Sequence, residues 1–196
     1  MEETLRERYL DAFPVTRRLL LGVAASVLAA GRGLAAADCA RTSRAIQGPY
    51  WRPDAPETAD LRRGPGGEPL VVRGVVRGGA PCAPLAGALL EVWQADEHGK
   101  YDADYGDGAT FLRARVRTRA DGSYEFRTVR PAPYGIGRSV RPAHIHFIVR
   151  AAGHRDLVTQ LYFSGDPHLQ SDPLAAVHPD LVQTVSGGAV TFDLVL

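Results

Sequence analysis

The chain has 196 residues, of which 45% are hydrophobic, and a formal net charge of +1 at pH 7. This length and composition are typical of one globular domain rather than two. Nucleic-acid binding normally depends on a concentrated basic patch, and here the arginines and lysines alternate with acidic and apolar residues. The charge pattern therefore argues against a nucleic-acid partner.

Residues 1–37 predict an export signal rather than part of the fold. Arg17 and Arg18 precede the apolar run Leu19–Gly31, and small residues of the Ala-x-Ala type follow it. The run is too short to span a bilayer, which needs roughly 20 residues. The paired arginines favour the twin-arginine route, with a Sec signal or a buried N-terminal helix as alternatives. We expect a periplasmic or extracellular protein whose single domain covers residues 38–196.

Cys39 and Cys82 are the two cysteines of the chain. An oxidising compartment would permit a disulfide between them, which the chain-entropy model values at about 4 kcal/mol. Two unrelated buried thiols are the alternative.

The region after the signal predicts an all-β fold, a β-sandwich of antiparallel strands with long loops and short helical pieces only. Runs rich in Val, Phe, Tyr and Thr alternate with turns that contain Gly, Pro and Asp. Asp121-Gly122 predicts a hairpin, and residues 173–185 have room for a short helix. In chain order the expected strands are Leu70–Arg77, Ala88–Ala95, Phe111–Thr118, Tyr124–Val129, Ala143–Ala151, Leu157–Phe163 and Val190–Leu196.

His144 and His146 stand two residues apart in the expected strand Ala143–Ala151. Successive strand side chains alternate faces, so both imidazoles point the same way, about 7 Å apart at roughly 3.3–3.4 Å per residue. A metal can sit between them, since imidazole is the commonest protein metal ligand. For this pair alone, a solvated strand face fits at least as well as a metal site.

Candidate partners of the two histidines lie in neighbouring segments. Tyr134 ends a proline-stiffened loop before the histidine strand, and Tyr101 follows an earlier strand. Arg141 leads into the histidine strand, and Gln160 lies one hairpin later. Each has an ordinary alternative, namely half-buried tyrosines at strand ends, a solvated arginine and a polar residue on an open sheet face. Tyr105 is a second candidate beside Tyr101.

Other polar loop residues predict only a solvated surface. The aspartates among them resemble a loose cation loop but lack the glycine and glutamate positions of an EF-hand. The residues assigned to this surface are His98, His154, His168, His178, Asp102, Asp104 and Asp107.

Four linked motifs resemble the intradiol ring-cleavage dioxygenases, the non-haem iron enzymes that include protocatechuate 3,4-dioxygenase and catechol 1,2-dioxygenase. In chain order they are LLEVWQAD…GKY, DGSYEFRTVRPAPY, RPAHIHF and VTQLYFSGD. The resemblance covers roughly Gly48 to Phe163. The segment Gly99-Lys100-Tyr101 matches the Gly-basic-Tyr pattern of the family and so favours Tyr101 over Tyr105. In size the chain is closer to a single protocatechuate-dioxygenase subunit, or to the secreted one-domain members, than to the catechol 1,2-dioxygenases with a helical dimerisation domain.

The resemblance implies an oxidoreductase that cleaves a catechol ring between its two hydroxyl-bearing carbons and incorporates both atoms of O2 into a muconate-type diacid. Phenolate oxygen is a hard donor suited to ferric iron, which separates such a site from the ferrous type with two histidines and one carboxylate. By resemblance, a catechol displaces Tyr134, Arg141 stabilises negative charge on the ring, and Gln160 orients groups near the oxygen pocket. The implied ligands of one Fe(III) per chain are Tyr101, Tyr134, His144 and His146.

Alternatives remain open from the sequence. An exported, non-catalytic β-sandwich binding module of transthyretin-like or carbohydrate-binding type has the same strand pattern. A zinc or copper site, or an iron-binding member without turnover, fits the two histidines. The loop Gly135–Val140 is shorter than the family often has, which predicts an open or reshaped pocket and leaves the particular catechol undetermined. We expect a small aromatic diol and O2 as partners, no nucleic acid and no stable membrane span; assembly into a homo-oligomer stays open.

Overall fold

The computed structural model describes residues 39–64, 66–79, 81–106, 108–137 and 139–196. The expected export signal at residues 1–37 lies outside the described residues, and so does Asp107. Nowhere in the described part of the chain does a helix reach the length and hydropathy of a membrane span.

The described residues form an all-β domain with single-turn 3-10 helices, which confirms the predicted fold class. The strands are β1 (Pro69–Arg77), β2 (Leu89–Gln94), β3 (Arg113–Arg117), β4 (Ser123–Val129), β5 (Tyr134–Ile136), β6 (Ser139–Arg141), β7 (His144–Arg150), β8 (Leu157–Phe163), β9 (Val182–Gln183), β10 (Ala189–Thr191) and β11 (Leu194–Val195). The 3-10 helices are η1 (Asp102–Tyr105), η2 (Leu169–Ser171), η3 (Ala175–Val177) and η4 (Pro179–Leu181).

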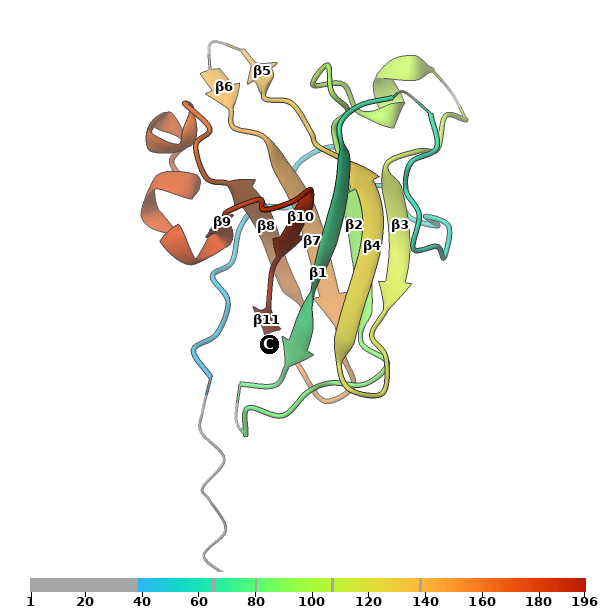
Figure 1. Ribbon diagram of the computed structural model, residues 1–196, viewed down its shortest axis with the longest axis vertical. Helices are drawn as coiled ribbons and strands as arrows, with labels where there is room; N and C mark the ends of the chain where they lie inside the picture. Colours follow the sequence, from blue (N-terminus) through green and yellow to red (C-terminus); the bar gives the residue numbers. More distant parts are fainter. Residues whose placement is uncertain (1–38, 65, 80, 107, 138) are drawn as a thin grey trace, which may run out of the picture. The chain divides into compact units, whose positions relative to one another are not determined.

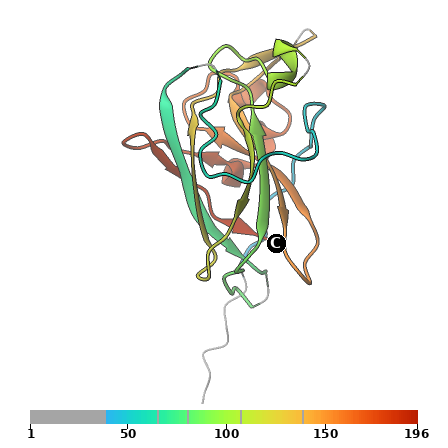
Figure 2. The same ribbon diagram turned by 90° about the vertical axis from the view of Figure 1, so that its right-hand side faces the viewer.

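Two sheets face each other across the domain. In one, β1 pairs with β4, β10 and β11; the other has the order β3-β2-β7-β8-β9. The strands β1 and β4 lie in front of β7 and β8 in Figure 1, and Figure 2 shows the same layers from the side. Neighbouring strands are antiparallel except β1–β10, β1–β11 and β8–β9. The hairpin of β5 and β6 forms a separate ladder and stands at the same end of the sandwich as η1 (Figure 1).

The main core fills the space between the sheets, because alternate residues of each strand point inward. Phe126 of β4 and Phe147 of β7 are both buried there, with ring centroids 6.1 Å apart. On β7 the inward residues are at odd positions, and the even positions face the outer side of the sheet. That outer side carries a second, smaller apolar cluster, which includes Trp93, Tyr101 and Ile148.

Residues 39–51, which precede β1 and are called the covering segment below, cover this outer side. The backbone N–H of Ala45 donates to the carbonyl of Val158 on β8 at 2.9 Å. Gly48, with a φ of +72°, lies so close to β7 that a Cβ there would be 3.2 Å from Cε1 of His146. The histidine-bearing face is therefore buried, which excludes the solvated strand face that the sequence left open.

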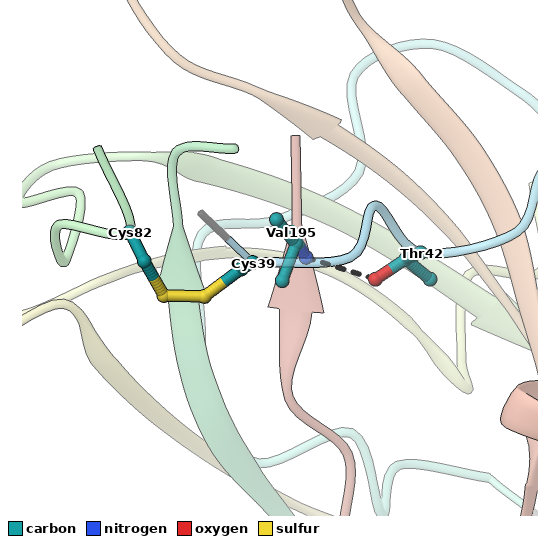
Figure 3. The surroundings of a disulfide bond; sticks show 4 residues. All are labelled: Cys39, Thr42, Cys82 and Val195. Atoms are coloured by element: carbon teal, nitrogen blue, oxygen red, sulfur yellow. Dashed lines mark hydrogen bonds between the residues drawn. A yellow bond between two sulfur atoms is a disulfide. The ribbon is translucent and has the colours of Figure 1, made fainter. Parts of the chain in front are cut away.

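A disulfide joins Cys39 to Cys82, so the two cysteines are paired and are not unrelated buried thiols (Figure 3). It ties the covering segment to the loop between β1 and β2. Beside it, the backbone N–H of Val195 in β11 donates to the hydroxyl of Thr42 at 2.8 Å (Figure 3). The beginning of the covering segment is thus fixed both to the β1–β2 loop and to β11.

The expected C-terminal strand, Val190–Leu196, is divided into β10 and β11, and the prediction of one strand is wrong there. Both parts run parallel to β1, and Phe192 lies between them. Phe192 passes so close to Gly74 that a Cβ at Gly74 would be 2.1 Å from the Phe192 carbonyl oxygen. Regular pairing is interrupted at this close approach, and the Asp193 carboxylate accepts the N–H of Val75 instead, at 2.9 Å.

Two other segments differ from expectation. Residues 173–185 hold the 3-10 turns η3 and η4 followed by β9 rather than a single helix. The predicted loop Gly135–Val140 is mostly hairpin, since it forms parts of β5 and β6. Short strands of this kind have too few residues for an alternating pattern to identify them.

Candidate metal centre

His144 and His146 share the outer side of β7, as strand alternation predicts. Their Nε2 atoms lie 3.1 Å apart, and both side chains are buried. His144 Nδ1 donates its hydrogen to the carbonyl of Pro142 at 2.7 Å, which leaves the Nε2 lone pair directed toward His146. Burial, with the nearby charge of Arg141, lowers the pKa of His144 to about 4. Burial and His144 lower the pKa of His146 as well, so both rings are neutral at pH 7, as metal binding requires.

The Tyr101 hydroxyl contacts Nε2 of His146. Its oxygen lies 3.0 Å from His146 Nε2, and its ring is completely buried. The turn between β2 and η1 carries it there. In that turn the Asp96 carboxylate accepts the backbone N–H of Lys100 at 2.9 Å, which fixes the chain just before Tyr101.

Tyr134, the first residue of β5, adds the second phenol. Its ring centroid lies 5.5 Å from that of His144 and 5.4 Å from that of Tyr101, which it meets edge to face. The two tyrosine-bearing segments touch at Gly99, where φ is +73° and a Cβ would lie 2.6 Å from the carbonyl oxygen of Pro133. Glycine at this position thus allows the approach that brings both phenols to the histidines.

These four side chains form a donor set that fits ferric iron. In the described ranges, no group of three or more His, Cys, Asp and Glu side chains is placed to hold a metal, so an ion at this centre depends on the phenol oxygens. Burial, reinforced by Tyr134, raises the pKa of Tyr101, and burial raises the pKa of Tyr134. Both phenols are therefore protonated at pH 7 unless a strongly charged cation displaces the protons, as bound cations do for other ligands.

Arg141 and Gln160 lie next to the four candidate ligands: Gln160 beside His146, and Arg141 beside Tyr134. Gln160 lies opposite His146 in the β7–β8 ladder, and its Nε2 is 3.1 Å from His146 Nδ1. Its Oε1 accepts a hydrogen bond from Arg141 Nη2 at 2.9 Å. Arg141 is itself the ladder partner of Tyr134 in the β5–β6 hairpin. The structure thus brings together all six site residues proposed from the sequence.

Two further residues of this cluster, Tyr162 and Asp172, were not predicted. The Tyr162 hydroxyl donates to Gln160 Oε1 at 2.5 Å, and the buried Asp172 carboxylate accepts the Nε–H of Arg141 at 2.5 Å. Tyr162 follows Gln160 by two strand residues, so alternation could have identified it. Asp172 lies in the irregular chain between η2 and η3, where no periodicity marks a buried residue.

Two aromatic rings stack on the candidate ligands. Tyr50, from the covering segment, lies parallel to Tyr101 at a centroid distance of 3.9 Å. Trp93 of β2 lies parallel to its ladder partner His146 at 4.7 Å. Such contacts restrict rotation of both rings, so the donor atoms are held in place before any ligand arrives.

Tyr105 lies apart from the centre. Its side chain is 44% exposed, and its hydroxyl donates to the Asp96 carboxylate. Of the two candidate tyrosines, Tyr101 is therefore the one beside the histidines. The loop histidines are exposed or partly exposed, as expected for His98, His154, His168 and His178.

The assignment of Asp102 to a solvated loop is wrong. Its side chain is 1% exposed and accepts hydrogen bonds from Arg52 and from Arg113, whose Nε lies 2.5 Å away. The neighbouring Asp104 is exposed, as predicted, but its carboxylate accepts the backbone N–H of Tyr101 at 2.8 Å. The aspartates after Tyr101 thus hold its turn in place.

Comparisons with known proteins find similarity to dioxygenases. A family model described as "Dioxygenase" matches residues 46–196. Chlorocatechol 1,2-dioxygenase from Rhodococcus opacus is 39% identical over 168 residues, which cover 74% of this chain and 65% of that protein. Catechol 1,2-dioxygenase 2 from Acinetobacter lwoffii is 41% identical over 163 residues, which cover 74% of this chain and 59% of that protein. The chain therefore spans somewhat less than two thirds of the length of these curated relatives.

A solved structure gives a closer match in length. It is the dioxygenase domain of a dioxygenase–carbohydrate-binding fusion protein from Streptomyces sp. SirexAA-E, with 38% identity and a TM-score of 0.68. The match covers 80% of this chain and 98% of that domain.

Proposed function

Because this chain belongs to the intradiol ring-cleavage dioxygenase family, we propose that it cleaves a catechol between its two hydroxyl-bearing carbons, with O2, to give a muconate-type diacid. The observation that carries the proposal is the meeting of two neutral imidazoles and two buried phenols at one point of the outer sheet face. A non-catalytic binding module would not need this donor set.

The residues that would hold Fe(III) are Tyr101, Tyr134, His144 and His146. When bound, ferric iron would supply a Lewis acid that draws the catechol in as a dianion and activates its ring toward O2. Tyr101 and His146 are the more firmly held of the four, since each lies under a stacked aromatic ring. Together with His144, whose Nδ1 is fixed by the carbonyl of Pro142, they would hold the metal throughout turnover.

Tyr134 is the phenol best placed to leave when the catechol arrives. It begins the three-residue strand β5, and the next two residues, Gly135 and Ile136, are exposed. Since burial raises the pKa of its phenol, a departing Tyr134 accepts a proton from the catechol readily at its Oη. The cross-strand position of Arg141, beside Tyr134, puts a guanidinium where it would stabilise negative charge on the bound ring.

Oxygen-uptake assays with catechol, chlorocatechols, hydroxyquinol and protocatechuate test the proposal and select the substrate. We expect uptake of one O2 per ring, and both oxygen-18 atoms of labelled O2 in the diacid. Tyr101→Phe should abolish this activity, and Tyr105→Phe, a matched change of a tyrosine outside the centre, should retain it. Absence of uptake from iron-loaded protein with every catechol would refute the proposal.

The proposal includes export through the twin-arginine route. The segment with Arg17 and Arg18 supports it, as does a disulfide, which persists in oxidising compartments. A protein that is exported after folding can bind its iron before it leaves the cytoplasm, which is one reason for an iron enzyme to use this route. Changing both arginines to lysine should stop export, and unimpaired secretion of that variant would count against the route.

A further inference from the structure

Arg141 has a long, flexible side chain, and a fixed position for it needs outside restraint. Both Arg and Lys side chains carry about 2 kcal/mol of rotamer entropy, which opposes a single orientation. Here Arg141 ends the short strand β6 of a hairpin whose tip, including Ile136 and Val140, is exposed. The hairpin backbone alone therefore does not explain an ordered guanidinium.

Asp172 supplies one restraint from a different part of the chain. Its side chain is 1% exposed, and its Oδ2 accepts the Arg141 Nε–H. Its Oδ1 accepts the backbone N–H groups of Leu174 and Ala175 at 3.0 and 2.9 Å. The carboxylate is thus fixed by the backbone at the start of η3, and its second oxygen is directed at the guanidinium.

Tyr162 and Gln160 supply the second restraint, from β8. Arg141 Nη2 donates to the Tyr162 hydroxyl and to Gln160 Oε1, at 2.9 Å in each case. The Tyr162 hydroxyl in turn donates a hydrogen bond to Gln160 Oε1. Gln160 is held in turn by its Nε2, which donates to the carbonyl of Ile46 at 2.8 Å and lies 3.1 Å from His146 Nδ1.

We propose that Asp172 and Tyr162 are positioning residues, which hold the Arg141 guanidinium against Gln160 in the orientation that acts on the bound catecholate. This rests on the proposed function. The network uses only Nε and Nη2 of Arg141, and Nη1 is not part of it. Neither residue contacts the four candidate ligands through a hydrogen bond in the described structure, so each acts through Arg141 and Gln160.

Asp172→Asn separates the two roles of this side chain. The variant keeps the shape and the oxygen that caps Leu174 and Ala175, but puts an amide N–H opposite the Nε–H of Arg141. Tyr162→Phe removes only the hydroxyl. For each variant we expect a fall in kcat/KM of about 10- to 100-fold, the size of effect seen when a hydrogen bond that orients a metal ligand is removed. Iron content and the colour of the iron-loaded protein should not change.

Asp180→Asn is the matched control. Asp180 also accepts a backbone N–H, that of Ser43 at 2.9 Å, but it has no contact with Arg141. This variant should keep the wild-type kcat/KM.

A double-mutant cycle distinguishes positioning from a structural role. In an Arg141→Lys background, Asp172→Asn should lower kcat/KM by less than about twofold, because the guanidinium through which it acts is gone. Equal losses in both backgrounds would overturn the proposal.

A second measurement needs neither iron nor substrate. In the metal-free protein the Nε–H NMR signal of Arg141, identified by its loss in Arg141→Lys, should exchange slowly with water and should shift and exchange faster in Asp172→Asn. An unchanged signal would overturn the proposal. If the wild type neither binds nor oxidises catechols but the signal responds, then the proposed function fails while the positioning of Arg141 stands.

Discussion

Replacing Asp102 by Asn should destabilise the metal-free protein strongly, although the sequence places this residue in a polar surface loop. Asp102 is 1% exposed, and its partner Arg113 is 3% exposed. Removing one member of a buried ion pair leaves an uncompensated charge away from water, at a cost of about 3 to 5 kcal/mol. For a domain of this size that corresponds to a fall in Tm of about 10 °C.

Urea unfolding at pH 7, followed by fluorescence, measures this loss. Asp156→Asn is the matched control because Asp156 pairs with Arg150 at the surface, where both side chains are more than one third exposed. Exposed pairs contribute at most about 1 kcal/mol. A loss below 1 kcal/mol for Asp102→Asn would refute the conclusion that the charge is buried and paired. Arg113→Ala should lower the free energy of unfolding more than Arg52→Ala does, since the Arg52 side chain is 37% exposed.

Three further predictions concern the disulfide, the metal ligands and pH. Changing Cys39 and Cys82 to Ser should lower the free energy of unfolding by about 4 kcal/mol, measured by urea unfolding without reductant; no loss would mean that the bond does not form in solution. His146→Ala should abolish iron binding, measured by metal analysis, and a fully loaded, active variant would contradict its assignment as a ligand. The metal-free protein should lose stability as the pH falls from 6.5 to 4. In this range His144 binds a proton in the unfolded chain but stays neutral in the folded protein, where burial lowers its pKa to about 4. At about 1.4 kcal/mol per pH unit this amounts to about 3 kcal/mol from His144, with a further loss from His146. Urea unfolding across that pH range, in wild type and in His144→Gln, measures it, and equal slopes would contradict the assignment.

Alternation along the strands was enough to predict much of the fold and the shared face of the two histidines. It placed His144 and His146 on one face of β7, and the ladder of β7 and β8 then puts Gln160 beside them. The other four site residues were assigned by the resemblance to the dioxygenase family, namely Tyr101, Tyr134, Arg141 and Gln160. Each of the long strands lies within one residue of its predicted bounds, namely β1, β2, β4, β7 and β8.

The features that were missed depend on contacts between distant segments. Nothing local shows that the chain near Gly48 covers the outer face of β7, or that Asp172 reaches back to Arg141. Asp102 looks solvated because its neighbours are polar, and its burial follows from the two arginines that fold over it. Polar residues buried in pairs carry no hydropathy signal, so pattern alone does not separate them from surface residues.

The central claim is that two tyrosines and two histidines hold ferric iron and present it to a catechol. The visible absorption spectrum of the iron-loaded protein, before and after anaerobic addition of catechol, tests it most directly. Bound tyrosinate should give a red-brown charge-transfer band, which should broaden to longer wavelength as the catecholate chelates the iron and Tyr134 leaves. A colourless protein with one bound iron, or a band that catechol does not alter, would contradict the claim.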